Sequence, residues 1–206
     1  VDKGSPVTSL DQLYLQAHAL HPILKSKVKG WADVSYGAFL ASREIKLHGG
    51  ATSRFVLWHI GRYNAKLREV IDWAECKSPA RAIEKVLHSY SGDISRLKDL
   101  CRQTIYFEDI EHISTCLDAM WHDDEIVILR IKNRLDPTDA PELYGGYRDL
   151  MLNLRVVTDV TKKLGIDTHI CEVRLALQCF GEIMVPERAA HANYVKLRNE
   201  IGDTGL

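Results

Sequence analysis

The spacing of apolar residues changes its period near residue 100, and this change constrains the fold more than any other feature of the sequence. Before it, apolar residues recur at intervals of three and four, as in an amphipathic α-helix. After it come short runs rich in β-branched and aromatic residues. We predict strands over 100–107, 126–132, 150–158 and 168–177, and a helix over 110–121. The pattern indicates an α+β fold, with a mixed β-sheet of about four to five strands flanked by helices.

The first part of the chain has a helical pattern. Ser9 is placed to cap a helix, and Gln12 follows three residues later, as in a capping box. We predict a second, short helix over 38–47 and a longer one that begins near Thr52. Residues 1–73 are therefore expected to form an N-terminal helical region.

The remaining residues, 74–206, are expected to form the second region, which contains the sheet. Its first helix begins at Pro79, because proline is well tolerated at the first helical position. Its last helix is predicted over 180–199, with a break near Pro186.

The composition is that of an ordinary globular protein. Hydrophobic residues make up 46% and charged residues 27%, and the formal net charge of -1 gives no strong overall attraction to nucleic acid or membrane. The cysteines form no CxxC pair, and no ligand spacing supports a zinc site. No run of about 18 apolar residues occurs. We expect reduced thiols, a cytoplasmic location and no membrane partner, while the oligomeric state stays open.

One candidate for phosphate binding is the segment Lys77-Ser78-Pro79, together with Lys85 on the helix that follows. The first turn of a helix has backbone N–H groups without intrahelical partners, and these attract anions. Lysines beside such a turn add positive charge. The segment therefore predicts a phosphate site around Lys77 and Lys85.

Two acidic residues on predicted strands are candidates for a metal site. Asp99 stands at the start of the strand over 100–107, and Glu172 lies within the strand over 168–177. Two carboxylates on neighbouring strands can hold Mg²⁺ between them. Cationic and aromatic side chains in these segments are candidates for nucleotide binding: Lys77, Lys85, Arg102, Lys132, Tyr147 and Arg148.

Taken in order, these segments resemble the motifs of the RelA/SpoT-like (p)ppGpp synthetases, over the range 76–199. Four segments of this chain align with family motifs. Residues 77–85 resemble K-S-P-x-S-I-x-x-K, and residues 98–105 resemble R-D-I-x-G-x-R-V. Residues 146–151 resemble G-Y-x-S-L-H, and residues 172–177 resemble E-V-Q-I-R-T. The resemblance implies a nucleotidyltransferase-type fold, ATP as pyrophosphate donor, Mg²⁺ as cofactor and nucleotides as substrates. The implied reaction transfers pyrophosphate from ATP to the 3′-hydroxyl of an acceptor.

The resemblance also implies a role for each candidate residue. Asp99 and Glu172 would bind Mg²⁺, and Glu172 would activate the acceptor hydroxyl. Tyr147 would stack on the acceptor base. The remaining candidates would contact phosphates: Lys77, Lys85, Arg102, Lys132 and Arg148.

The chain also departs from the family pattern, at Glu75, Arg81, Thr104, Met151 and Ala176. Thr104 and Ala176 replace arginines, and Met151 replaces a histidine. One interpretation of these departures is that the enzyme uses a different acceptor, and the 3′ end of an RNA is one such acceptor. The alternative is a catalytically inactive module that keeps the fold and binds a nucleotide or a protein.

Each candidate residue also has a structural interpretation. Asp99 could form a solvated pair with Lys98, and Glu172 could be an exposed sheet residue. Arg148 and Asp149 could form a local ion pair of small energetic weight. These interpretations stay open at the level of the sequence.

Overall fold

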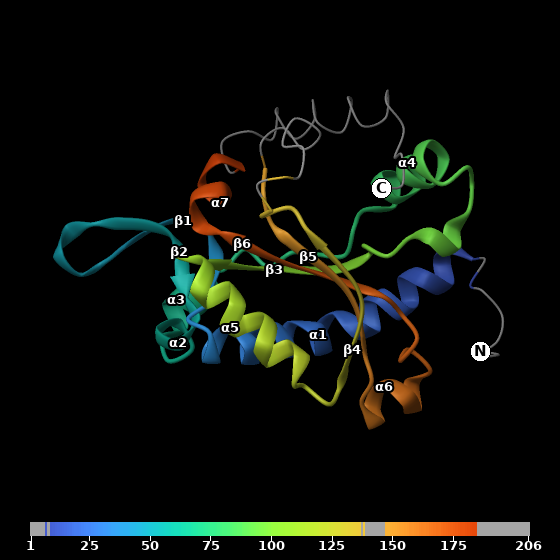
Figure 1. Ribbon diagram of the computed structural model, residues 1–206, viewed down its shortest axis with the longest axis horizontal. Coiled ribbons are helices and arrows are strands. Elements are labelled where there is room, and N and C mark those ends of the chain that lie inside the picture. Colours follow the sequence, from blue (N-terminus) through green and yellow to red (C-terminus); the bar gives the residue numbers. More distant parts are fainter. Residues whose placement is uncertain (1–6, 8, 137, 139–146, 185–206) are drawn as a thin grey trace.

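The structure is a computed structural model, and it describes residues 7, 9–136, 138 and 147–184. Its described strands form a six-stranded mixed sheet in the order β2-β1-β3-β6-β5-β4 (Figure 1). Strands β3 and β6 are parallel, and the other neighbouring pairs are antiparallel. The strands are β1 (Ala38–Lys46), β2 (Thr52–Leu57), β3 (Cys101–Phe107), β4 (Ile126–Asn133), β5 (Leu150–Val156) and β6 (Cys171–Leu177). The predicted fold class is confirmed, with six strands where about four to five were expected.

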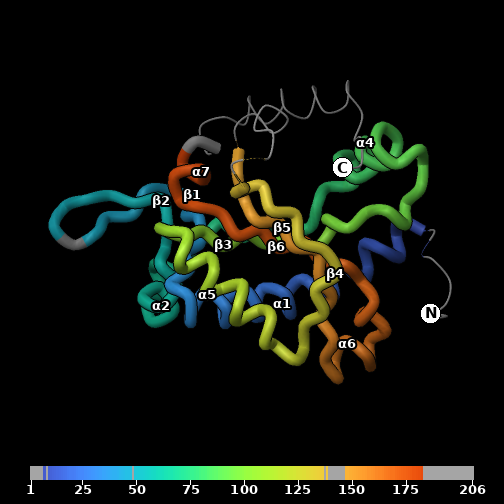
Figure 2. The backbone as a smooth tube through the Cα atoms, in the orientation of Figure 1, coloured from blue at the N-terminus to red at the C-terminus, as the bar shows by residue number. Residues whose placement is uncertain are grey.

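Helices cover both faces of the sheet. Helices α1 and α5 lie along one face, and α4 and α7 rise on the other (Figures 1 and 2). The α-helices are α1 (Leu10–Val34), α2 (Trp58–Gly61), α3 (Ala65–Glu69), α4 (Pro79–Ser89), α5 (Ile110–Trp121), α6 (Asp159–Leu164) and α7 (Gln178–Met184). Two short 3₁₀ helices are η1 (His48–Gly50) and η2 (Ile94–Arg96).

Several predicted elements are confirmed. The helix expected over 110–121 is α5. Helix α1 begins as expected, because the side chain of Ser9 accepts a hydrogen bond from the backbone N–H of Gln12. Pro79 is the first residue of α4.

The helix predicted over 38–47 is wrong. The helix predicted from Thr52 onward is wrong for residues 52–57, and after them the chain forms two short helices, α2 and α3, in place of one long helix. Residues 38–46 form β1 and residues 52–57 form β2, which pair as an antiparallel hairpin. Phe39 and Phe55 are buried in this arrangement. Pairing between strands and burial of aromatic rings outweigh the weak helical spacing, because strand preference depends on tertiary context. The region 1–73 is therefore not all helical, and the boundary after residue 73 stays a prediction.

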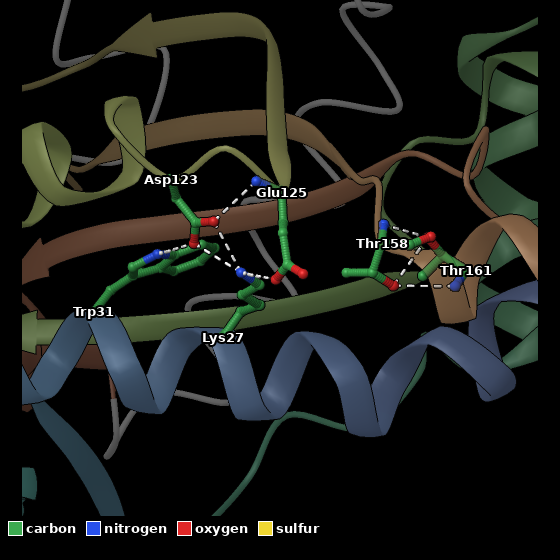
Figure 3. A network of polar contacts seen from close by, with 6 residues as sticks. All are labelled: Lys27, Trp31, Asp123, Glu125, Thr158 and Thr161. Carbon is green, nitrogen blue, oxygen red and sulfur yellow. Dashed lines mark hydrogen bonds and ion pairs between the residues drawn. The ribbon is translucent and has the colours of Figure 1, made fainter.

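Two further differences concern the end of the chain. Helix α6 was not predicted, although Thr158 and Thr161 form the capping box at its start (Figure 3). The predicted helix over 180–199 overlaps α7, which ends at Met184. The rest of that prediction, with the break near Pro186, lies outside the described residues.

Strand β3 divides its side chains between the two faces of the sheet. Cys101, Ile105 and Phe107 are fully buried and belong to the core that includes α1 and α5. Tyr106 lies on the opposite face, where Gly181 of α7 packs against its ring. Alternation along the strand places Arg102 and Thr104 on this second face as well.

The second face, which we call the α4/α7 face, continues across the neighbouring strands by register. Arg102 is paired with Glu172 on β6, and Glu172 with Asn153 on β5. The next row holds Thr104, Arg174, Met151 and Lys132. The α4/α7 face is thus rich in polar and charged side chains, unlike the apolar face under α1 and α5.

A polar network fastens α1 to the turn between α5 and β4. The Asp123 carboxylate accepts hydrogen bonds from Lys27 Nζ, at 2.9 Å, and from Trp31 Nε1, at 3.0 Å (Figure 3). Glu125 adds a second ion pair with Lys27, at 2.6 Å. The network holds α1 in place beneath the sheet.

Candidate active site

Asp99 is the centre of a buried ion-pair cluster at the start of β3. Its Oδ2 atom accepts from Lys77 Nζ at 2.6 Å and from Lys85 Nζ at 3.1 Å. The residue is only 5% exposed. The sequence interpretation of Asp99 as a solvated partner of Lys98 is therefore wrong, since its partners are two lysines from the segment around α4.

Backbone contacts hold Lys77 in this position. Its N–H donates to the carbonyl of Leu100 at 3.0 Å, so the segment before α4 runs beside the start of β3. Its carbonyl accepts from the Tyr14 hydroxyl at 2.6 Å. Lys85 lies two turns into α4, with its ammonium group 5.3 Å from the centre of the Tyr90 ring.

Burial and charge act in opposite directions in this cluster. Burial alone would raise the pKa of Asp99, but Lys85 and Lys77 outweigh it and hold that pKa well below its usual range. Burial also lowers the pKa of Lys77, against the attraction of Asp99. For Lys85, burial is outweighed by Asp99 and Tyr90, so its pKa is raised. The carboxylate is therefore ionised at neutral pH.

Glu172 lies close to the same cluster. It is 4% exposed, and its register partner on β3 is Arg102. Its charge also contributes to raising the pKa of Lys85, which is itself bonded to Asp99. The interpretation of Glu172 as an exposed sheet residue is wrong, and the two acids lie around a shared group of cations.

A second ionic cluster was not anticipated from the sequence. Asp149 is fully buried, and its Oδ1 atom accepts from Arg134 Nε at 2.7 Å and Nη2 at 2.5 Å. Arg174 Nε donates to Glu172 Oε1 at 2.8 Å and lies 3.9 Å from Asp149 Oδ2. One signal was available, because alternation along β6 places Arg174 on the same face as Glu172.

The expected ion pair between Arg148 and Asp149 is not among the contacts of the described residues. Arg148 instead donates from Nη1 to the carbonyls of Arg134, at 3.2 Å, and Asp136, at 2.7 Å. It therefore secures the chain that follows β4. Its predicted role in nucleotide binding stays a prediction.

The other predicted nucleotide ligands lie on or near the α4/α7 face. Arg102 lies beside the first cluster, where its charge helps to lower the pKa of Lys77. Lys132 is half-buried on β4, in register with Met151. The Tyr147 ring packs edge-on to Phe180 of α7, with centroids 6.4 Å apart, and burial raises its pKa. The roles of these residues in binding also stay predictions.

The donor set at Asp99 fits a Mg²⁺ ion that is completed by substrate. Asp99 Oδ1 is buried and has no hydrogen-bond partner, so one carboxylate oxygen is available. Within the described residues, no group of three or more His, Cys, Asp or Glu side chains could hold a metal ion. Proteins commonly bind Mg²⁺ through one or two carboxylates together with substrate phosphates. Asp99 and Glu172 match that smaller set.

No protein-family model matches the sequence, and no curated protein matches it either. The chain is similar to solved structures of alarmone synthetases, at low identity. One is small alarmone synthetase 1 from Bacillus subtilis bound to its product pppGpp, with 15% identity and a TM-score of 0.48, over 62% of this chain and 65% of that one. Another is a GTP pyrophosphokinase family protein from Streptococcus pneumoniae, with 15% identity and a TM-score of 0.48, over 69% of this chain and 79% of that one.

A third similar structure is the complex between the Type VI effector Tas1 and its immunity protein. It has 18% identity and a TM-score of 0.47, and the match covers 81% of this chain and 60% of that one. The match spans less than two thirds of two of these chains: 60% of the one from the Tas1 complex and 65% of small alarmone synthetase 1. In the described part of the chain, no helix has the length and apolar character needed to cross a membrane.

Proposed function

We propose that this chain transfers pyrophosphate from ATP to the 3′-hydroxyl of a nucleotide, with Mg²⁺ as cofactor. The observation that carries the proposal is the position of two buried carboxylates, Asp99 and Glu172, around the cations Lys77, Lys85 and Arg102. Phosphoryl transfer depends mainly on positioning and charge neutralisation. A cluster in which cations outnumber carboxylates suits a triphosphate chain.

Each residue has a defined task in the proposed reaction. Lys77, Lys85 and Arg102 bind and neutralise the phosphates of ATP. Asp99 and Glu172 would hold Mg²⁺, which when bound polarises the phosphates. Tyr147, which packs against Phe180 of α7, would offer a flat ring for the acceptor base.

The proposed transfer balances in atoms and charge. The 3′-oxygen of the acceptor bonds to the β-phosphorus of ATP, and the bond between that phosphorus and the α–β bridging oxygen breaks. AMP leaves, and Glu172 takes the proton of the attacking hydroxyl. The product carries a pyrophosphate at its 3′-oxygen.

The test is label transfer. The protein is incubated with Mg²⁺, ATP labelled at the γ-phosphate and one acceptor at a time: GDP, GTP, other nucleotides or RNA. We expect labelled acceptor from the wild type, and at least about 10²-fold less from Glu172→Gln, as removal of a general base predicts. The matched control is Glu125→Gln, because Glu125 is 53% exposed and lies in the network with Lys27, away from the cluster around Asp99.

A second candidate function is nucleotide binding without turnover. Both acids are engaged by cations of the protein itself, Asp99 by two lysines and Glu172 by Arg174. If the site stays in that state, nucleotide binds and no product forms. Calorimetry separates the two functions: tight ATP binding that is unchanged in Glu172→Gln, without labelled product from any acceptor, supports the binding module.

A further inference from the structure

Arg174 lies between two buried carboxylates and forms a hydrogen bond with only one of them. Its Nε atom donates to Glu172 Oε1 at 2.8 Å, whereas Asp149 Oδ2 is 3.9 Å away, beyond hydrogen-bond distance. The Arg174 side chain is 32% exposed, so it is not fully enclosed by the protein. One donor group therefore faces two possible acceptors.

Asp149 is incompletely satisfied in this arrangement. Arg134 bonds to its Oδ1 atom, but Oδ2 is buried and has no hydrogen-bond partner. A buried carboxylate oxygen without a donor is unfavourable by about 1–3 kcal/mol or more. A shift of Arg174 Nε by roughly 1 Å towards Asp149 would bring that oxygen within hydrogen-bond distance.

Glu172 and Asp149 are the two carboxylates that attract Arg174, and Tyr147 also interacts with it. The register partners of Arg174 are Thr104 on β3 and Met151 on β5, and neither bears a charge. Two residues further along β6 stands Ala176, which is also uncharged. Attraction to Glu172 and to Asp149 raises the pKa of Arg174 further, so it stays a cation in both arrangements.

We propose that Arg174 is a positioning residue that alternates between Glu172 and Asp149. When it is bonded to Glu172, it covers the carboxylate that the proposed reaction needs. When it moves to Asp149, it satisfies the unpartnered oxygen and leaves Glu172 free for a divalent cation. A Mg²⁺–nucleotide complex shifts the population to the second state, because it binds only there. The inference rests on the proposed function, through the role of Glu172.

The experiment measures metal binding and does not require turnover. Mn²⁺ serves as the probe in place of Mg²⁺, together with a non-hydrolysable ATP analogue, and its binding is followed by electron paramagnetic resonance. We expect Asp149→Asn to weaken Mn²⁺ binding about tenfold, because Arg174 then stays on Glu172. We expect Arg174→Gln to strengthen it about three- to tenfold, because Glu172 is then always free.

The double variant decides between a switch and simple electrostatics. If Asp149 acts through Arg174, Asp149→Asn has less than about a twofold effect in the Arg174→Gln background. If the two charges act independently through space, the effects of the single variants add. Additive effects would overturn the inference.

Controls keep the result interpretable. Arg155→Gln is the matched control, because Arg155 lies on β5 in register with Val127, outside the two clusters. Circular dichroism and urea unfolding check that each variant folds, and Asp149→Ser replaces Asp149→Asn if the latter does not. A wild type that binds no Mn²⁺–nucleotide contradicts the proposed function and this inference together. A wild type that binds, with additive variants, overturns the inference alone.

Discussion

Glu172 of β6 lies directly beside Arg102 of β3, in the parallel register at the centre of the sheet. Asp99 lies just before β3, where Lys77 and Lys85 bind its carboxylate. Glu172 approaches from the neighbouring strand, and α4 supplies Lys85 from above. The candidate site is thus built where two parallel strands begin, and not within a loop.

Lys85 is expected to contribute to nucleotide binding. Lys85→Met removes one of the two ammonium groups on Asp99, and we predict about tenfold weaker ATP binding, since a charge-assisted hydrogen bond contributes about 1.5–3 kcal/mol. Isothermal calorimetry measures the change. Lys98→Met is the matched control, because Lys98 is exposed and adjacent to Asp99 in the sequence. Equal effects of the two substitutions would show that only overall charge matters.

Helix α7 is expected to depend on the absence of a side chain at Gly181. A Cβ atom there would lie 2.7 Å from Tyr106 Cε1 and 2.9 Å from Phe55 Cζ. We predict that Gly181→Ala lowers the free energy of unfolding by about 1–3 kcal/mol, because the rings must shift. Urea unfolding measures it.

Gly30 provides the opposite case within α1. A Cβ atom at Gly30 would meet nothing within 4 Å. Gly30→Ala is therefore expected to raise the free energy of unfolding by about 0.5–1 kcal/mol, because alanine loses less backbone entropy in a helix. A loss of stability here, measured by the same urea unfolding, would contradict the described packing of α1.

His169 is expected to make stability dependent on pH. It is buried, its Nδ1 atom lies 3.2 Å from Gln16 Oε1, and burial lowers its pKa from 6.5 to about 4. The folded state therefore favours the neutral ring, so the contribution is complete above pH 6.5 and is lost as the pH falls towards 4. Between pH 7.5 and 5 we predict a loss of about 2 kcal/mol in the free energy of unfolding. His169→Asn should be less sensitive to pH over this range, and an unchanged slope would contradict the prediction.

The hydrogen bonds and ion pairs at Asp123 are expected to contribute strongly to the packing of α1 against the rest of the protein. Asp123 accepts from Lys27, from Trp31 and from the backbone N–H of Glu125. Asp123→Ala removes the acceptor of Trp31 Nε1 and of the Glu125 N–H, whereas Lys27 keeps its ion pair with Glu125. We predict a loss of about 2–3 kcal/mol in the free energy of unfolding. Glu125→Ala, which removes only a half-exposed partner, should change it by less than about 1 kcal/mol. Chemical denaturation of both variants provides the comparison.

The fold class and most of the second region could be predicted from the sequence. Helix α5 and strand β3 have strong local patterns, and local periodicity is sufficient where it agrees with tertiary packing. The strands β1 and β2 could not be found in this way. Their pairing with each other, and the contact of Ala38 with Tyr106 across the sheet, are non-local.

The candidate site was predictable in its residue types but not in its ion pairs. Lys77, Lys85 and Asp99 were each identified from their segments, yet their convergence on one oxygen depends on the path of the chain between α4 and β3. The partners of Asp149 were missed because they lie on other segments: Arg134 directly follows β4, and Arg174 lies within β6. Ion pairs between distant segments leave no periodic signal in a sequence.

The most direct test of the central claim is to locate the divalent cation itself. Crystals of the protein with Mn²⁺ and a non-hydrolysable ATP analogue are measured for anomalous scattering. We predict one Mn²⁺ ion within about 2.3 Å of an oxygen of Asp99 and an oxygen of Glu172, with the remaining ligands from phosphates and water. Nucleotide bound with Mn²⁺ that contacts neither carboxylate would contradict the proposed site.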